Sequence, residues 1–526
     1  MRNRRLVLFA AVVAAAVAAG VAAATSSTTG TLTQVSGASP FPSSCGPENV
    51  AAQEANGGVL YRNSEVEPWI DVNPANPNDM VGIWQQDRWS NGGSRGLVSS
   101  STFNGGATWN ALVPIPGITW CSGGTYDRAT DPWVSFGPTG VVHQLALSFN
   151  DFFPPFDATD EQPGGDFDHA LYASRSTDGG LTWSTPVLVR RDLDANVFND
   201  KQSITADPFD PNYVYAIWDR LVFPGSERAS IQAGFRAAAY SGPAWFSRST
   251  TGGASYEPAR EIYDPGTNKQ TIGNQIFVLP DNDLVDLFDL ILNTRGATAT
   301  GAFYNVAVIR SEDRGATWGP VRRNGKIEPI VVDSMRTIFI TDPETGDDVR
   351  TGDIIPDGAV APNGDLYAVW QDARPNTMQA DAIVVSKSTD GGFTWSQFAK
   401  VNKTPTTIPV GNQQAFTPSI DVAADGTVAV TYYDFRNNDA AAPLWTDYWI
   451  VHCHPSASVS CASSGDWGNE VRLTDAPFDM RQAPNAGGFF TGDYEGLASA
   501  GNVFTPFWSM PHGADPSSTF FQRVGP

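Results

Sequence analysis

The sequence predicts an all-β protein assembled from repeats of one four-stranded antiparallel unit. An eight-residue turn segment recurs along the chain, and a strand–turn–strand unit precedes each copy. The composition, with 50 Gly, 38 Pro and 11% aromatic residues, suits many short strands joined by turns. No window shows a sustained 3.6-residue hydrophobic period, so long helices are not expected.

The turn segment is clearest at 388–395, which reads Ser-Thr-Asp-Gly-Gly-Phe-Thr-Trp, and at 176–183, which differs only by Leu181. Asp accepts bonds from nearby backbone N–H groups and adjacent Gly residues supply positive φ, so each copy predicts a tight turn between two strands. The closing Trp should pack beneath the turn. Copies begin at positions 102, 176, 249, 311, 388 and 460, and the last keeps only its two ends.

The second repeated unit is a strand, a turn with Gly, Asn or Asp, and a strand that ends in an aromatic residue. It occurs at 69–84, 133–149, 203–218, 276–288, 355–370, 419–433 and 494–508. There are thus seven hairpins and six turn segments. The last unit has a third strand at 519–524, and residues 58–62 are expected to supply its outer strand. This closure would remove exposed sheet edges.

The turn segments match the Asp-box, or BNR repeat, and through them the chain resembles the sialidase superfamily of β-propellers over about residues 55–526. The resemblance implies a β-propeller of four-stranded antiparallel blades. The hairpins predict seven blades, with six, the number in classical sialidases, as the alternative. The resemblance also implies that the Asp-boxes lie on the face away from the active site and serve the fold.

Residues 1–24 have a basic start, an Ala/Val-rich run and the end Ala-Ala-Ala, a pattern typical of a secretory signal peptide cut near Ala24. Residues 25–54 are expected to be a flexible Ser/Thr/Gly-rich linker, and 55–526 the propeller. We therefore expect a secreted monomer without stable membrane insertion. Loss of the three leader arginines takes the net charge from −23 to −26, which disfavours nucleic acid as a partner.

Four cysteines in an exported chain favour disulfides over metal. Cys453 and Cys461 are close enough in sequence to close a local loop, which would leave Cys45 and Cys121 to tie the N-terminal segment to the first unit. The two other pairings remain open.

Cations are expected where the second strands of the units end, on the face that the resemblance assigns to the ligand. Arg88, Arg374 and Arg436 each follow an aromatic residue by four positions, and His512 takes that place in the last unit. Convergent arginines would hold a substrate carboxylate bidentately, as in sialidases. In the alternative, each Arg pairs with a nearby Asp and fixes its own loop. Arg220 is a further candidate for substrate binding.

The segment from Gly492 to Gly496 is the densest cluster of catalytic side-chain types. The resemblance implies a Tyr nucleophile polarised by a carboxylate, with an Asp as acid/base. A structural turn is the alternative for this segment. The candidates are Tyr494 as nucleophile, Glu495 or Asp493 as its polarising group, Asp131 and Asp87 as acids, and Trp69 and Trp133 as substrate contacts.

The family's early Arg-Ile-Pro type motif is missing, and Glu67-Pro-Trp stands in its place. Sialic acid is therefore one candidate among acidic sugars. The predicted function is a sialidase-like glycoside hydrolase that acts on terminal sialic or other acidic sugars of a glycan. A non-catalytic glycan- or protein-binding propeller and a polysaccharide lyase are the alternatives.

The long acidic loop at 151–168 is a candidate Ca²⁺ site, because calcium takes oxygen ligands. Solvated acidity is the alternative, and no cofactor is required. The candidate ligands are Asp157, Asp160, Asp166 and Asp168.

Overall fold

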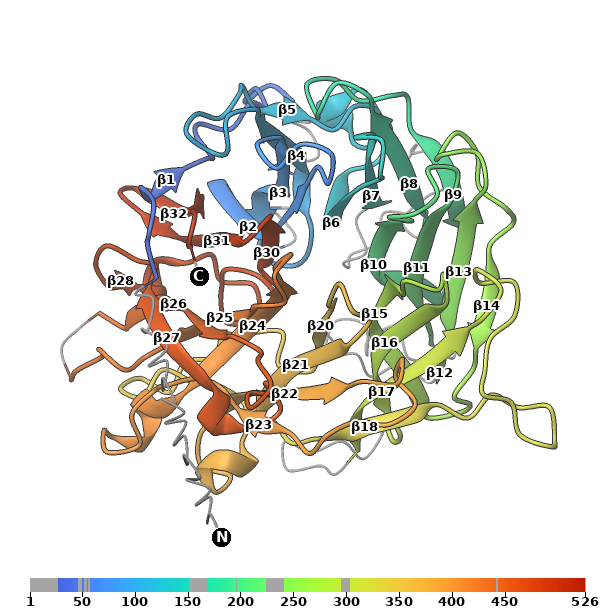
Figure 1. Ribbon diagram of the computed structural model, residues 1–526. Coiled ribbons are helices and arrows are strands. Elements are labelled where there is room, and N and C mark those ends of the chain that lie inside the picture. Colours follow the sequence, from blue (N-terminus) through green and yellow to red (C-terminus); the bar gives the residue numbers. More distant parts are fainter. Residues whose placement is uncertain are drawn as a thin grey trace, which may run out of the picture.

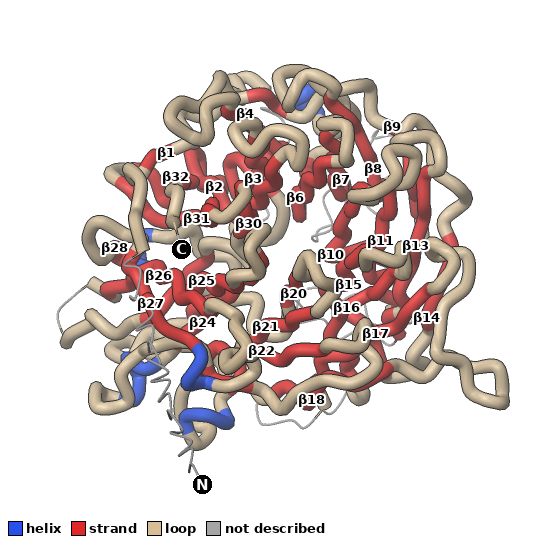
Figure 2. The backbone as a smooth tube through the Cα atoms, in the orientation of Figure 1, coloured by secondary structure: helices blue, strands red, loops and turns tan. Residues whose placement is uncertain are grey.

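The computed structural model describes residues 27–45, 50–51, 54, 57–150, 168–194, 196–223, 241–294, 303–440 and 443–525. Strands dominate these residues, which confirms the all-β prediction (Figure 2). No helix within them is long and apolar enough to cross a membrane. The named helices are short 3-10 turns: η1 (Trp120–Ser122), η2 (Arg374–Asn376), η3 (Val410–Gln413), η4 (Ser464–Asp466) and η5 (Met480–Gln482).

Consecutive strands pair antiparallel in groups that follow one another around a common centre (Figure 1). The first groups are β2 (Leu60–Val72), β3 (Met80–Trp89), β4 (Ser94–Thr102) and β5 (Val113–Pro114); β6 (Arg128–Phe136), β7 (Val142–Phe149), β8 (His169–Ser176) and β9 (Val187–Asp192); β10 (Val197–Ala206), β11 (Val214–Val222), β13 (Ala244–Ser249) and β14 (Arg260–Tyr263); and β15 (Lys269–Val278), β16 (Leu284–Ile291), β17 (Tyr304–Ser311) and β18 (Ile330–Met335).

The later groups continue the same order around the molecule. They are β20 (Asp357–Val360), β21 (Leu366–Asp372), β22 (Ala382–Ser388) and β23 (Ala399–Lys400); β24 (Ala415–Val422), β25 (Val428–Asp434), β26 (Trp445–Cys453) and β27 (Trp467–Arg472); and β30 (Gly496–Ala500), β31 (Val503–His512) and β32 (Asp515–Phe521). Four short strands lie outside this pattern: β12 (Ser241–Gly242), β19 (Val349–Arg350), β28 (Phe478–Asp479) and β29 (Phe489–Phe490).

Each predicted hairpin corresponds to the first two strands of a group, from β2–β3 to β30–β31. The first strand of each group lies nearest the centre in Figure 1. Apolar side chains of one group pack against those of the next. For example, one core cluster joins Leu287 and Val308 of the fourth group to Ala368 and Trp370 of the fifth. The hydrophobic core is therefore distributed between neighbouring groups.

The repeated turns, by which we mean 102–109, 176–183, 249–256, 311–318 and 388–395, connect the outer strands of their groups. In one of them, Ser176 Oγ accepts a bond from the N–H of Gly180 (2.9 Å), and Asp178 Oδ1 accepts one from the N–H of Thr182 (2.9 Å). Gly179 and Gly180 have φ of 70° and 87°, so both lie where glycine is favoured. The turns at 311–318 and 388–395 repeat both bonds.

The last group is completed by a strand that the sequence did not predict. β1 (Thr33–Gln34) pairs antiparallel with β32, with Thr33 opposite Phe521, and it lies beside β32 in Figure 1. The expectation that residues 58–62 form this outer strand is wrong, because Leu60 and Tyr61 pair with β3. Thr33 and Gln34, expected in a flexible linker, thus belong to the sheet, and Thr29 forms an isolated bridge with Val524. The predicted signal peptide at 1–24 lies outside the described residues.

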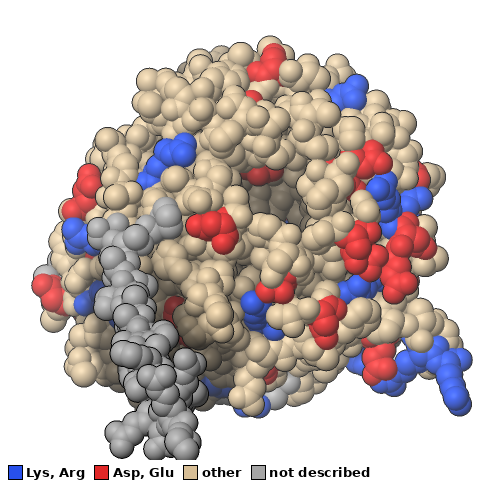
Figure 3. Space-filling model, in the orientation of Figure 1, with Lys and Arg blue, Asp and Glu red and all other residues tan. Residues whose placement is uncertain are grey.

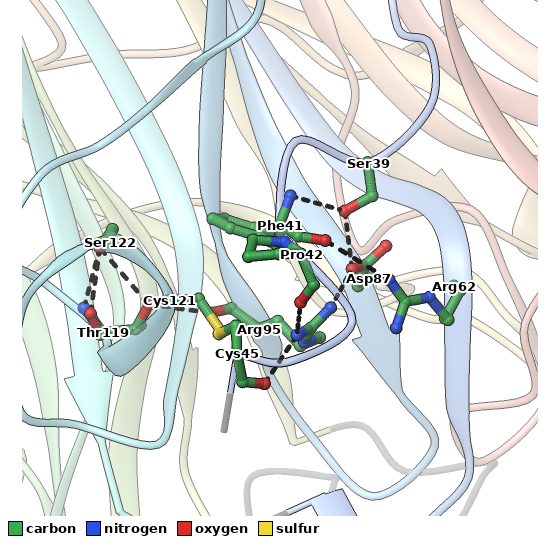
Figure 4. The surroundings of a disulfide bond; sticks show 10 residues. All are labelled: Ser39, Phe41, Pro42, Cys45, Arg62, Asp87, Arg95, Thr119, Cys121 and Ser122. Atoms are coloured by element: carbon green, nitrogen blue, oxygen red, sulfur yellow. Dashed lines mark hydrogen bonds and ion pairs between the residues drawn. A yellow bond between two sulfur atoms is a disulfide. The ribbon is translucent and has the colours of Figure 1, made fainter. Parts of the chain in front are cut away.

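Both predicted disulfides are present, Cys45–Cys121 and Cys453–Cys461. The first fastens an N-terminal strap, residues 39–45, across the first strand group (Figure 4). Arg95 Nη2 donates to the carbonyls of Pro42 and Cys45, each at 2.8 Å.

Candidate functional site

Five first strands begin with the same backbone irregularity. The pairing register of β6, β10, β15 and β24 shifts in the first half of the strand, and that of β2 shifts twice, the second time between Val66 and Trp69. One residue at each shift, counting the second for β2, has positive φ. Such a bulge re-aims the side chain that it carries. These five residues, here called the strand-start ring, are Glu67, Asp131, Lys201, Gly273 and Thr417.

The ring members from the first three groups converge on one ammonium. Lys201 Nζ lies 3.2 Å from Glu67 Oε1 and 3.4 Å from Asp131 Oδ1, and 2.7 Å from Oδ2 of Asp493, which precedes β30. Gln85 donates to the second oxygen of Glu67. All three carboxyl groups are buried. Residues more than 400 positions apart in sequence therefore form one acid cluster.

Two arginines adjoin this cluster. Arg350 donates from Nε to Asp493 Oδ1 (2.9 Å) and from Nη2 to Oδ2, a bidentate ion pair. Its guanidinium lies 4.4 Å from the ring centroid of Phe490, and that of Arg88 lies 5.1 Å from the same ring. Arg88 is 2% exposed and donates from Nη1 to Gln85 Oε1 (2.7 Å).

Three aromatic rings form one wall beside the cluster. Trp69 and Trp133 stack with their centroids 3.5 Å apart, and Tyr494 meets them edge-on at 5.9 and 5.4 Å. Trp69 is half-buried, while Trp133 and Tyr494 are buried. Lys201 Nζ lies 5.8 Å from the Tyr494 centroid. Such a wall places apolar ring surface, of which Trp69 is the more exposed part, next to the charged groups.

The pKa values of the carboxyl groups are driven in opposite directions. Burial, with the nearby Asp131 and Asp493 charges, raises the pKa of Glu67 well above its usual range, although Lys201 opposes the shift. Burial would also raise the pKa of Asp493, but Arg350 and Lys201 hold it far below its ordinary value. Lys201 likewise lowers the pKa of Asp131 against the effect of burial. The surroundings therefore favour the protonated form of Glu67 and the ionised forms of Asp131 and Asp493.

The structure separates the predicted catalytic residues. Tyr494 lies in the aromatic wall, and its hydroxyl donates to the Pro132 carbonyl (3.2 Å). Burial, followed by the charges of Glu67 and Asp131, raises its pKa, so the neutral phenol is favoured. The Glu495 carboxylate does not share the partners of Asp493. It accepts bonds from Tyr433 Oη (2.8 Å) and the Ser509 N–H (3.0 Å). Asp493 and Glu495 precede β30 (Gly496–Ala500) and lie in an irregular bend, so the two carboxyl groups can face different partners.

Asp87, a predicted acid, instead binds the N-terminal strap. It accepts bonds from Ser39 Oγ (2.8 Å), the Asn63 N–H (2.9 Å) and Arg95 Nη1 (3.1 Å) (Figure 4). The Asp131 carboxylate, by contrast, belongs to the cluster around Lys201.

The structure does not bring the predicted arginines together. Arg374 pairs with Asp372, Nε to Oδ1 at 2.8 Å, and Arg436 pairs with Asp434, Nε to Oδ2 at 2.5 Å. Each therefore binds the Asp two positions before it, as in the local alternative. Arg88 alone of the three adjoins the acid cluster.

The remaining predicted contacts lie elsewhere. Arg220 donates from Nη2 to Asp192 Oδ1 (2.7 Å) and covers the Trp245 ring. His512 is exposed and meets the Phe520 ring edge-on.

The candidate calcium ligands Asp157, Asp160 and Asp166 lie outside the described residues. Asp168 is buried and accepts bonds from Arg191 Nε (2.8 Å) and Tyr126 Oη (2.9 Å). Within the described ranges, no group of three or more His, Cys, Asp or Glu side chains is arranged to hold a metal ion.

A hollow of about 310 Å³ lies at the other end of the first strands, lined in part by Asp71, Ser135, Thr205 and Asp421. Its polar side chains bind the neighbouring strand. Asp71 accepts the Phe136 N–H (2.6 Å), and Thr205 Oγ1 donates to the Ile276 carbonyl (2.8 Å). We therefore assign these side chains to the fold, and the acid cluster remains the candidate site. Figure 3 shows that one face of the molecule is hollowed near its middle.

Sequence reasoning missed Lys201 and Arg350 as members of the site. Lys201 stands at a strand start beside other charged residues, so its position in the repeat could have identified it. Arg350 lies in β19, outside the repeated units, and its register with β29 (Arg350 opposite Phe490) appears only in the structure.

No family model matches the chain, and no curated protein matches it. Solved structures that are similar include a Hadza microbial sialidase, at 17% identity over 71% of this chain and 64% of that one, with a TM-score of 0.43. They also include an α-L-arabinanase from Penicillium chrysogenum complexed with arabinobiose (13% identity, 77% and 94% covered, TM-score 0.44). A leech intramolecular trans-sialidase matches at 9% identity, over 94% of this chain and 98% of that one, with a TM-score of 0.44.

Proposed function

We propose that the protein is a secreted glycoside hydrolase on a sialidase-like β-propeller, with the carboxyl cluster around Lys201 as its active site. The observation that carries the proposal is that adjacent acids have pKa values driven apart beside a stacked tryptophan pair. Glycosidic cleavage uses such a pair, a protonated carboxyl as acid and a carboxylate as nucleophile or base.

The propeller of this proposal has seven blades. The blades begin with β2, β6, β10, β15, β20, β24 and β30, and β1 supplies the outer strand of the last. The two disulfides suit an oxidising compartment outside the cytoplasm.

Each member of the cluster has a role in this proposal. Glu67 protonates the leaving oxygen, because its pKa is raised, and Asp131 acts as the carboxylate that attacks the anomeric carbon. Lys201 holds both groups and keeps Asp131 ionised. Since one ammonium binds both carboxyl groups, they stay close together, which favours retention of anomeric configuration over inversion. The Tyr494 ring is part of the sugar-binding wall.

The test is hydrolysis of a panel of 4-nitrophenyl glycosides that covers sialic, uronic, hexose and pentose sugars. With any substrate that is cleaved, Glu67→Gln and Asp131→Asn should each lower kcat/KM by about 10²–10⁴-fold. Asp178→Asn, in a repeated turn, is the matched control and should leave the rate unchanged. Wild-type rates in folded Glu67→Gln and Asp131→Asn proteins would contradict the proposal.

A glycan-binding propeller without catalysis is the second candidate. One observation favours it: the Glu67, Asp131 and Asp493 carboxyl groups are buried and already bonded, whereas Trp69 is partly exposed. In that case the wild type should bind oligosaccharides without cleaving them, and Trp69→Ala should abolish binding while Glu67→Gln does not.

A further inference from the structure

The Asp493 side chain occupies a cation clamp of the kind that recognises carboxylates. Arg350 contacts both of its oxygens, and Lys201 Nζ lies 2.7 Å from Oδ2. A guanidinium fork with an adjacent ammonium is the arrangement that proteins use for a ligand carboxylate. Here the chain itself supplies the anion.

The backbone holds Asp493 in this clamp. A Cβ on Gly352 would lie 2.1 Å from the Asp493 carbonyl oxygen, and one on Gly492 would lie 3.0 Å from the Glu67 nitrogen. The Asp493 N–H also points to Glu67 Oε1 at 3.4 Å. Chain segments on both sides are therefore in close contact with this backbone and hold Asp493 beside the two cations.

Other arginines near the strand ends are also paired with acids of the protein. Arg374, Arg436 and Arg220 bind Asp372, Asp434 and Asp192. Arg88 has a buried Nε with no hydrogen-bond partner, but its side chain is 2% exposed and lies against Phe490. An incoming sugar carboxylate would therefore have to displace Asp493 to reach the pair formed by Arg350 and Lys201.

We propose that Asp493 is a built-in occupant of the carboxylate clamp and directs the active site to sugars without a carboxylate. This inference rests on the proposed function for its substrate, and it replaces the acidic sugars that the sequence suggested with uncharged ones. It also makes Asp493 a specificity-determining residue, since its removal should open a carboxylate-binding site between Lys201 and Arg350.

The first experiment measures rescue of Asp493→Ala by acetate. The melting temperature of this variant should be lower than that of the wild type, and acetate should raise it by several degrees relative to chloride at equal ionic strength, because a bound anion stabilises the folded state. The wild type should respond equally to the two salts. The double variant Arg350→Met/Asp493→Ala is the control and should show no preference for acetate.

If Asp493→Ala does not fold on expression, refolding yields replace melting temperatures. A higher yield in acetate than in chloride supports the clamp. Equal responses to the two salts, in either measurement, overturn it.

The second experiment concerns the sugar. Calorimetric titration with glucuronate and with glucose compares one ring with and without its carboxylate. Asp493→Ala should bind glucuronate roughly 10- to 100-fold more tightly than the wild type does, in keeping with one or two bonds to charged groups. Wild-type protein that prefers glucuronate to glucose would overturn the proposal.

These binding measurements do not need turnover. Absence of hydrolysis with intact acetate rescue would therefore remove the hydrolase proposal and leave the clamp standing. Hydrolysis of uncharged glycosides without acetate rescue would support the hydrolase proposal and overturn the clamp.

Discussion

The repeated turns and the strand-start ring are both places where the chain repeats a backbone shape, but they use the repetition differently. In the turns, the same side chains make the same bonds in successive copies, as Asp178, Asp313 and Asp390 do with a Thr N–H four positions on. In the ring, the bulge and the positive φ recur, while the side chain changes from Glu67 to Asp131 to Lys201.

This difference separates architecture from chemistry. Where both backbone and side chain repeat, the segment has one task in every group, which is to close a turn. Where the backbone repeats and the side chain varies, the repeat supplies equivalent positions around the centre, and their different groups combine into one cluster. The predictions below test that distinction, from the largest expected effect to the smallest.

Lys201→Met should lower the free energy of unfolding by about 3–5 kcal/mol, because it leaves buried carboxylates without their cation. Urea denaturation measures the loss. Lys387→Met is the matched control: its side chain is about as exposed as that of Lys201, but it pairs outside the ring with one carboxylate, that of the more exposed Asp365, at 2.7 Å. Its loss should therefore be smaller, about 1 kcal/mol. Equal losses would show that the ring is no different from an ordinary ion pair.

Trp183→Ala should cost about 3 kcal/mol, at the lower end for a truncated buried aromatic. Trp183 packs on the preceding strand group, where its Nε1 donates to Ser99 Oγ (2.9 Å). Any activity per folded molecule should stay at the wild-type value, since the turn has an architectural role. Reduced turnover in fully folded protein would show that the turns take part in function.

His143 should make the turn region sensitive to acid. It lies beneath the turn at 249–256, and burial together with Arg175 lowers its pKa to about 4. The unfolded chain binds a proton near pH 6.5, so stability is full above that pH and falls by about 1–3 kcal/mol as the pH drops towards 4. His143→Gln should reduce the fall in stability between about pH 6.5 and pH 4. Part of the fall should remain, because His452 has a similarly lowered pKa. An unchanged slope would contradict the assignment.

Asp178→Ala should cost about 0.5–1.5 kcal/mol, because it removes bonds to the Thr182 N–H and hydroxyl in an exposed turn. The copy at 249–256 provides a reciprocal test. There Thr251 Oγ1 already accepts the Ser255 N–H at 3.0 Å, so Thr251→Asp should change stability by less than about 0.5 kcal/mol. Thermal melts of both variants measure these effects. A large loss in Thr251→Asp would show that the copies are not interchangeable.

The sequence predicted well those features that depend on neighbouring residues. The turns, the hairpins and the Cys453–Cys461 pair follow from local chemistry, and Cys45–Cys121 followed by elimination. In the candidate site, the sequence singled out Asp131, Asp493 and Tyr494, but not Lys201 and Arg350, the cations that lie beside them.

The remaining features depend on contacts between distant segments. Arg350 reaches Asp493 from a strand outside the repeat. Arg374 and Arg436 have the same spacing from an aromatic residue as Arg88, yet a nearby Asp binds each of them, while the Asp before Arg88 binds the N-terminal strap instead. Sequence spacing shows which positions are equivalent, but not which partner a long side chain selects.

The pairing of β1 with β32 has a consequence for biogenesis. These strands are separated by almost the whole chain, with Gln34 opposite Phe520, so β1 has no partner during most of synthesis. Until β32 emerges, Thr33 and Gln34 lack the strand with which they pair in the finished protein. Pairing of β1 with β32 is therefore a late event in synthesis. A nascent chain stalled before β32 should accordingly be far more sensitive to protease at residues 29–36 than the finished protein.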